Sequence, residues 1–122
     1  QLKCVVPRKR IEVRDGEVSK GKTEKNNLVN YIKENLESID GARGCLTAQF
    51  FKHKITENIV GIEINPRFGG GYPLSYKAGA NYPKWLIEEY LLNKSIKAFD
   101  DWEDNLLMLR YDKEVWVNDS TA

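Results

Sequence analysis

The feature that most constrains the fold is a pair of strand-like segments joined by a short polar connection. Residues 44–52 and 58–65 each show the alternation of a β-strand, and only residues 53–57 separate them. A parallel pairing needs a much longer crossover, so these two segments should pair as an antiparallel hairpin. In the second segment one face carries Val60, Ile62 and Ile64, and the other carries Gly61, Glu63 and Asn65. The sequence therefore predicts a hairpin with one polar face.

A second hairpin is predicted at the start of the chain. Residues 2–13 have strand character, interrupted by Pro7. The dipeptide Asp15-Gly16 is typical of a tight hairpin turn, and residues 17–20 would return as the second strand. This pattern again favours antiparallel pairing.

Three helices are predicted. From residue 24 to residue 39 apolar side chains recur at helical spacing, and Gly41 lies where a C-terminal cap glycine is expected. A short helix is expected over residues 74–78, and a longer one over residues 81–92 with Pro83 in its first turn. The chain is therefore predicted to be α+β, with one antiparallel sheet and helices packed on one face of it.

The last part of the chain is predicted to form a third hairpin, over residues 105–118, that turns at Asp112-Lys113. A length of 122 residues fits a single domain over residues 1–122, with a core at about residues 4–96. The chain starts with apolar residues and no Met, so we expect it to be the C-terminal part of a longer domain.

Composition argues against several functional classes. A net charge of +1 gives no electrostatic basis for nucleic-acid binding, and no apolar run approaches the length of a membrane span. No signal-peptide pattern is present, and we expect a cytoplasmic protein. With His53 as the single histidine, and with Cys4 far from Cys45, neither a zinc site nor a Ser/His/Asp triad is expected.

Oxygen ligands converge on the polar face of the residue 44–65 hairpin. Glu63 and Asn65 lie two residues apart, so their side chains point to the same side of the strand. If residue 51 pairs with residue 61, then Gln49 faces Glu63. Carboxylate and amide oxygens are ligands that suit Mg²⁺. The same pattern also fits a solvated strand face that ends in a turn, so the residues alone leave both interpretations open.

Three arginines and a glycine run extend this candidate site. Arg67 follows the strand directly and could reach a phosphate as a permanent cation. Arg8 and Arg10 share a strand face and could flank a substrate or phosphate, or lie on an ordinary basic surface. The Gly69-Gly70-Gly71 run could bring backbone amides to an anion, or form a flexible turn. It is not a P-loop, because no Gly-Lys-Ser/Thr follows.

Residues Glu63-Ile64-Asn65-Pro66-Arg67 resemble the Glu-(Ile/Val)-Asn-Pro-Arg signature of ATP-grasp enzymes, such as the carbamoyl phosphate synthase large subunit and relatives of biotin carboxylase. The resemblance covers roughly residues 8–96. In the carbamoyl phosphate synthase branch a Gln precedes the signature Glu by fourteen positions, as Gln49 precedes Glu63 here. The chain looks most similar to carbamoyl phosphate synthase large subunit-like proteins. Residues 68–71 depart from the full synthases, which leaves the substrate open.

The resemblance implies that Gln49, Glu63 and Asn65 ligate the Mg²⁺ or Mn²⁺ ions that bridge the phosphates of ATP. It implies that Arg67 contacts phosphate or an acyl-phosphate intermediate. The enzyme would use ATP to phosphorylate a small carboxylate substrate, and an amine would then displace the phosphate. In this family the adenine pocket and the phosphate-binding lysines lie earlier in the sequence, so we expect the isolated chain to be inactive.

Two alternatives remain at this stage. One is an ATP-grasp enzyme of the peptide or amino-acid ligase type. The other is a non-enzymatic α+β binding module in which the Glu-x-Asn pair is incidental. An oligomer is compatible with either.

Overall fold

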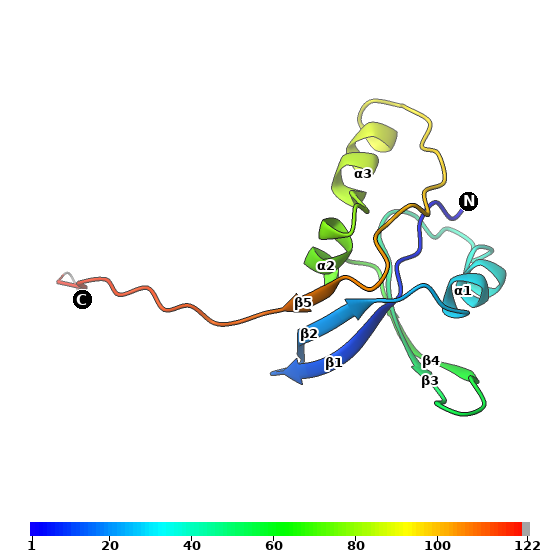
Figure 1. The fold of residues 1–122 in the computed structure, drawn as a ribbon. Helices are drawn as coiled ribbons and strands as arrows, with labels where there is room; N and C mark the ends of the chain where they lie inside the picture. Colours follow the sequence, from blue (N-terminus) through cyan, green and yellow to red (C-terminus); the bar gives the residue numbers. More distant parts are fainter. Residues whose placement is uncertain (121–122) are drawn as a thin grey trace.

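The N-terminal hairpin forms two strands of a three-stranded antiparallel sheet. A computed structural model describes residues 1–120. Strands β1 (Arg8–Arg14) and β2 (Glu17–Thr23) flank the predicted turn at Asp15 and Gly16, whose left-handed φ angles are 50° and 78°. Strand β1 begins directly after Pro7 rather than at residue 2, because proline cannot donate to a ladder. Strand β5 (Leu107–Leu109) pairs with the other edge of β2, in the order β1-β2-β5 (Figure 1).

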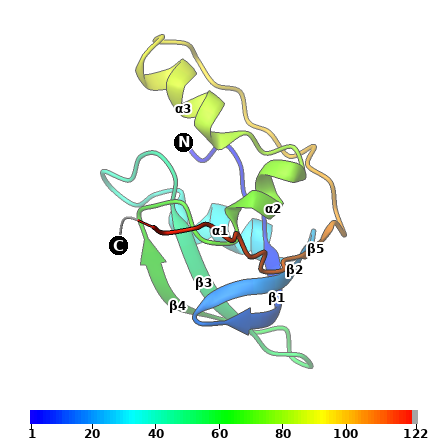
Figure 2. The ribbon, with the colours of Figure 1, turned by 90° about the vertical axis from the view of Figure 1, so that its left-hand side faces the viewer.

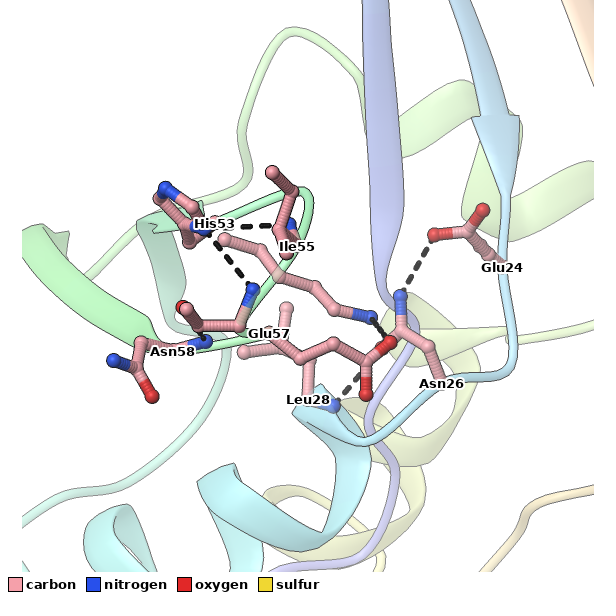
Figure 3. Close-up of polar contacts among 9 residues, drawn as sticks. Glu24, Asn26, Leu28, His53, Ile55, Glu57 and Asn58 are labelled. Atoms are coloured by element: carbon pink, nitrogen blue, oxygen red, sulfur yellow. Dashed lines mark hydrogen bonds and ion pairs between the residues drawn. The ribbon is translucent and has the colours of Figure 1, made fainter.

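Strands β3 (Thr47–Lys52) and β4 (Ile59–Asn65) form a separate two-stranded sheet. The α+β class with antiparallel pairing is confirmed, but the expected single sheet is in fact two. Figure 2 shows β3 lying between β4 and β1, without ladder pairing between β3 and β1. The connecting turn is closed by the amide of His53, which donates to Asn58 O at 2.8 Å. Nδ1 of the exposed His53 accepts the amides of Ile55 and Thr56 at 3.2 and 3.1 Å (Figure 3).

The first helix, α1 (Leu28–Leu36), is shorter at both ends than predicted. The side chain of Asn26 accepts the Leu28 amide at 2.9 Å and donates to Glu24 at 2.8 Å (Figure 3). A bond from an Asn side chain to the backbone amide two residues later favours a turn over a helix. Residues 24–27 are therefore not helical, and α1 begins at Leu28. Gly41 does adopt a left-handed φ of 73°, but it lies beyond the end of the helix.

The other two helices follow the glycine run. Helix α2 (Tyr72–Lys77) begins one residue after Gly71. Helix α3 (Tyr82–Tyr90) has Pro83 in its first turn, as expected, and Asn81 Oδ1 accepts the Lys84 amide at 3.2 Å. Side-chain acceptance at this position satisfies a helix amide that has no partner within the helix. No helix in the described part of the chain has the length and apolar character needed to cross a membrane.

The buried core lies where α2 packs on β2. Its apolar members are Leu74, Ala78, Ala80 and Trp102, each at most 5% exposed. A Cβ at Gly21 on β2 would lie 3.5 Å from Leu74 Cδ2, which shows how closely α2 approaches this strand. Neither α1 nor α3 contains a buried residue. The apolar face of the β3–β4 hairpin is also largely open, with Val60 61% exposed.

The predicted hairpin over residues 105–118 is wrong. Residues 107–109 pair with β2, and residues 110–120 form no strand. Arg110 and Asp112 still contact the body, and the chain beyond them extends away from it (Figure 1). The alternation correctly indicated a strand in this segment, but that strand pairs with the open edge of β2 rather than with the residues that follow it. Thr23, which is fully buried, fixes the contact: its Oγ1 donates to Glu103 O at 2.7 Å and accepts the Leu106 amide at 2.9 Å.

Candidate metal and phosphate site

Gln49 and Glu63 are direct cross-strand partners in the β3–β4 ladder. This confirms the predicted pairing of the two, although the expected pairing of residue 51 with residue 61 is wrong. Phe51 pairs with Val60 because the register shifts by one residue between Gln49 and Phe50. The extra residue on β4 makes a bulge, and the pairing is regular from there to the end of β4. The polar end of the hairpin therefore lies on the undisturbed side of the bulge.

Asn65 extends this polar face and pairs with Thr47. Its Nδ2 donates to Glu63 Oε1 at 3.1 Å, so the two side chains lie together on the strand face as predicted. Gln49 and Glu63 are opposite one another, and Glu63 and Asn65 are in contact. The structure thus gathers two amide groups and one carboxylate at the end of a two-stranded ladder.

This donor set suits a hard cation that also binds a polyanion. Mg²⁺ usually takes one or two protein carboxylates and completes its shell with phosphate oxygens and water. Glu63 supplies one carboxylate, and Gln49 and Asn65 can each present a side-chain oxygen. Within residues 1–120 no group of three or more His, Cys, Asp or Glu side chains could hold a metal by itself. A metal at this face would therefore depend on additional ligands such as phosphate.

Arg67 is held just beyond the end of β4 by its own backbone. Its carbonyl oxygen accepts Thr47 Oγ1 at 2.7 Å and the Cys45 thiol at 3.8 Å, so the chain is tied back to β3 at this point. The guanidinium itself is exposed and donates to Phe68 O at 3.2 Å. These bonds fix the position of the Arg67 backbone, while the exposed guanidinium can still reorient.

Arg8 and Arg10 reach different parts of the site. Arg10 Nη1 lies 3.5 Å from Gln49 Oε1, which connects β1 to the amide-and-carboxylate face. Arg8 instead donates to Ser75 Oγ at 3.3 Å, and burial lowers the pKa of its guanidinium. The two arginines therefore share a strand face, as predicted, but Arg10 lies at the oxygen ligands and Arg8 lies at the glycine run.

The glycine run is packed closely against both sheets. A Cβ at Gly69 would lie 2.9 Å from Thr47 Cγ2, and a Cβ at Gly71 would lie 3.4 Å from the Arg8 guanidinium carbon. The backbone of the run therefore lies close to Arg8 and to β3. A side chain at position 69 would collide with Thr47, which accounts for glycine there. The interpretation as a loose turn does not fit this packing.

Two residues near the run were not identified from the sequence. Ser75 accepts from Arg8, and Arg110 Nη2 donates to Gly70 O at 2.7 Å while its Nη1 lies 3.6 Å from Glu17. Arg110 comes from the segment after β5, so its position depends on pairing between distant parts of the chain. No local sequence pattern could have indicated it.

The surroundings of the two cysteines do not favour a reactive thiol. Both are free and half-buried. Burial raises the pKa of the Cys45 thiol and raises that of Cys4 to about 11. Thiols with raised pKa values stay protonated at neutral pH and are poor nucleophiles.

An open depression of about 1300 Å³ joins these features. Its lining includes Arg8, Arg10, Gln49, Asn65 and Arg67, together with the whole glycine run. It is larger than a typical small-ligand pocket, because it also takes in the space beside α1 and the N-terminal residues. Glu63 is not part of this lining, so the continuous surface connects the two amide ligands, Gln49 and Asn65, to the arginines.

Comparison with known proteins gives one family. A sequence model described as "ATP-grasp in the biosynthetic pathway with Ter operon" matches residues 1–113. No curated protein matches the chain.

Proposed function

Since the chain belongs to this ATP-grasp family, we propose that it forms the metal- and phosphate-binding half of an ATP-dependent ligase site of the carbamoyl phosphate synthase-like type. The observation that carries the proposal is the placement of Gln49, Glu63 and Asn65 side by side on the β3–β4 ladder. By the resemblance, Glu63 and Asn65 correspond to the metal ligands of the ATP-grasp signature, and Gln49 corresponds to the metal-binding Gln of the carbamoyl phosphate synthase branch.

Glu63, Asn65 and Gln49 would hold Mg²⁺ or Mn²⁺ through oxygen atoms. Asn65 directs its amide nitrogen at Glu63, which leaves its oxygen turned away from the carboxylate. Rotation of the amide by half a turn would present that oxygen to a cation shared with Glu63. To bind the same cation, Gln49 Oε1 would give up its 3.5 Å contact with Arg10 Nη1. A divalent ion held by these residues would neutralise negative charge on the phosphates during phosphoryl transfer.

The arginines would bind the anionic groups beside the metal. Within residues 1–120 none of Arg8, Arg10 and Arg67 has a carboxylate within ion-pair distance. An arginine without a carboxylate partner keeps its donors available for phosphate or an acyl phosphate. Arg67 would contact the transferred phosphoryl group, while Arg8 and Arg10 flank it from β1. The positioned cations stabilise charge that develops during transfer.

The reaction would begin with phosphorylation of a small carboxylate by ATP. An amine would then attack the acyl carbon, and phosphate would leave. In this scheme the chain's own residues bind and orient the phosphoryl group, and residues outside these 122 would contribute the adenine-binding part of the site.

Isothermal titration of ATP·Mg²⁺ into the chain should then show binding much weaker than micromolar. Micromolar binding would contradict the partial-site proposal.

Activity tests the metal assignment directly. When the chain is joined to the upstream half of an ATP-grasp domain, Glu63→Ala and Asn65→Ala should abolish ATP turnover while circular dichroism stays unchanged. Full turnover in either variant would exclude these residues as metal ligands.

A further inference from the structure

The carbonyl oxygens of the glycine run all have hydrogen-bond partners within the chain. Gly69 O and Gly71 O accept amides from the first turn of α2 at 3.0 and 3.2 Å. Gly70 O accepts Arg110 Nη2 at 2.7 Å. Nη1 of the same arginine lies 3.6 Å from Glu17, so the carboxylate on this side of the run is also paired. The run therefore has no acceptor left to offer.

The amides of the same three residues have no acceptor. No backbone or side-chain atom of residues 1–120 takes a hydrogen bond from them. Gly71 is buried, and buried backbone amides are nearly always hydrogen-bonded, so an unpaired one points to a ligand. All three residues line the open depression. The run thus presents only hydrogen-bond donors to it.

A cation lies against this run. A Cβ at Gly69 would lie 3.5 Å from Arg8 Nη2, and one at Gly71 would lie 3.4 Å from Arg8 Cζ. Within the described chain Arg8 makes one side-chain hydrogen bond, from Nη1 to the buried Ser75 Oγ at 3.3 Å, and no ion pair. A guanidinium has five donors, so most of those of Arg8 are unused.

The ionisable groups around Arg8 do not compensate its charge. Tyr82, Cys45 and Tyr72 act on it electrostatically, and burial raises the pKa of each. All three are therefore uncharged at neutral pH. A half-buried cation beside free amides is an arrangement that binds oxyanions. We refer to Arg8 and the amides of residues 69–71 as the Arg8 pocket.

The Arg8 pocket is separate from the metal face. Arg8 and Arg10 are two residues apart on β1, which spaces their backbone positions by about 7 Å. Arg10 lies at Gln49, whereas Arg8 lies at the glycine run and Ser75. Both arginines line the same depression, so one small molecule could contact the two places together.

We propose that the Arg8 pocket holds a second anionic group, a carboxylate or a phosphate, of the acid that the enzyme activates. The reacting carboxylate would lie at the metal face, and the second group would anchor the other end of the same molecule. The substrate class is then a small acid with two anionic groups. That the ligand is a substrate rests on the proposed ligase function, whereas anion binding by the pocket does not.

Anion titration without a divalent metal tests the pocket by itself. Inorganic phosphate and acetate, titrated at constant ionic strength, should shift the amide NMR signals of residues 69–71. Arg8→Met removes the donors and roughly keeps the length of the side chain, so it should weaken anion binding by about tenfold or more. Arg14→Met removes the same charge from the exposed far end of β1 and should leave the affinity unchanged.

Two results would overturn the pocket. One is the absence of shifts at residues 69–71 with both anions, a measurement on the wild-type chain that stands even if Arg8→Met does not fold. The other is an equal affinity in wild type and Arg8→Met. Glu63→Gln, which changes only the metal face, should leave these shifts as they are. The pocket and the metal face can therefore fail separately.

Titration with Mg²⁺ present identifies the second group. Glutarate should bind at least about tenfold tighter than acetate if that group is a carboxylate, because its two ends bind as one molecule. Phosphoglycolate should show this gain instead if the group is a phosphate. In either case the signals of residues 69–71 should shift together with those of Asn65 and Arg67.

Equal affinities for acetate and both two-anion acids would overturn the substrate class. So would ATP·Mg²⁺ that displaces phosphate from residues 69–71, because the pocket would then belong to the nucleotide.

Discussion

Gln49 and Glu63 face each other across the β3–β4 ladder, immediately before the point where that ladder changes register. The bulge beyond them places Phe50 opposite Gly61, and a Cβ built at Gly61 would lie in ordinary contact with the Phe50 ring at 3.7 Å. The irregularity is thus absorbed at an apolar pair, and the paired polar end keeps a regular geometry. A ligand set needs such a fixed spacing.

Replacing the one carboxylate of the polar face should weaken divalent cation binding. Glu63→Gln keeps the shape of the side chain but removes its charge, so Mn²⁺ affinity should fall roughly 10–100-fold. Paramagnetic broadening of the amide signals of residues 47–50 and 62–67, followed by NMR during a Mn²⁺ titration, measures this change. Glu34→Gln makes the same charge change on the exposed surface of α1 and should have no effect. Equal broadening in the two variants would argue against the metal assignment.

Adding one methyl group to the glycine run should destabilise the fold. In Gly69→Ala the new Cβ would lie 2.9 Å from Thr47 Cγ2, and we expect a loss of about 1–3 kcal/mol in the free energy of unfolding. Urea denaturation measures it. Thr47→Ser removes the opposing methyl and keeps the hydroxyl, so the double variant should recover part of the loss.

Gly70→Ala is the matched comparison for this prediction. Its Cβ would meet the flexible side chain of Glu17 at 3.5 Å, so it should cost clearly less. An equal loss at both positions would mean that general loop stiffness, rather than contact with Thr47, limits the run.

Removing the hydroxyl of Thr23 should loosen the C-terminal segment. This buried group makes two hydrogen bonds, to Glu103 O and from the Leu106 amide. Thr23→Val leaves both backbone groups without that partner, at a cost of about 1–3 kcal/mol. Amide hydrogen exchange should rise at residues 105–110 more than in β4, whereas Thr23→Ser should retain most of the protection. Uniform acceleration would contradict a local role.

Stability should decrease in alkaline solution because of Cys4. Burial raises the pKa of its thiol from 9.0 to about 11, so the unfolded chain loses this proton first. The contribution is fully present below pH 9.0 and is lost as pH rises through about 11. After allowance for partial exposure the loss is roughly 1–2 kcal/mol. Half-buried Tyr82, whose hydroxyl donates to Cys4 O at 3.0 Å and whose pKa is also raised, acts in the same direction.

Urea midpoints at about pH 8 and about pH 10.5 measure this dependence. Cys4→Ala should reduce the difference between the two midpoints relative to the wild-type chain. An unchanged difference would assign the alkaline loss to other groups, with Tyr82 the next to test through Tyr82→Phe.

Local patterns were sufficient to predict the polar ligand face. The short connection between β3 and β4 and the two-residue repeat of a strand together place Gln49, Glu63 and Asn65 on one side of the hairpin. The start of α3 was also predictable, because Asn81 and Pro83 act within one turn of the helix. In these cases the cause lies within a few residues of the effect.

The errors arose where distant segments compete. Strand character at residues 105–118 was real, but nothing local indicates that β2 would be its partner. One error has a local cause instead: the Asn26 side chain accepts the Leu28 amide and shortens α1, and helical periodicity does not register such a bond. Arg110 was missed for the same reason as β5, since its place beside Gly70 follows from that long-range pairing.

The attachment of β5 to β2 also sets an order of events during synthesis. The contact from Thr23 to Glu103 spans eighty positions, so the edge of β2 that pairs with β5 has no partner until residues 103–109 have left the ribosome. Until then the hairpin of β1 and β2 has two open edges, and such edges invite pairing with other nascent chains. Closure of the sheet consequently follows formation of the β1–β2 hairpin, and the long separation of the two partners along the chain slows it.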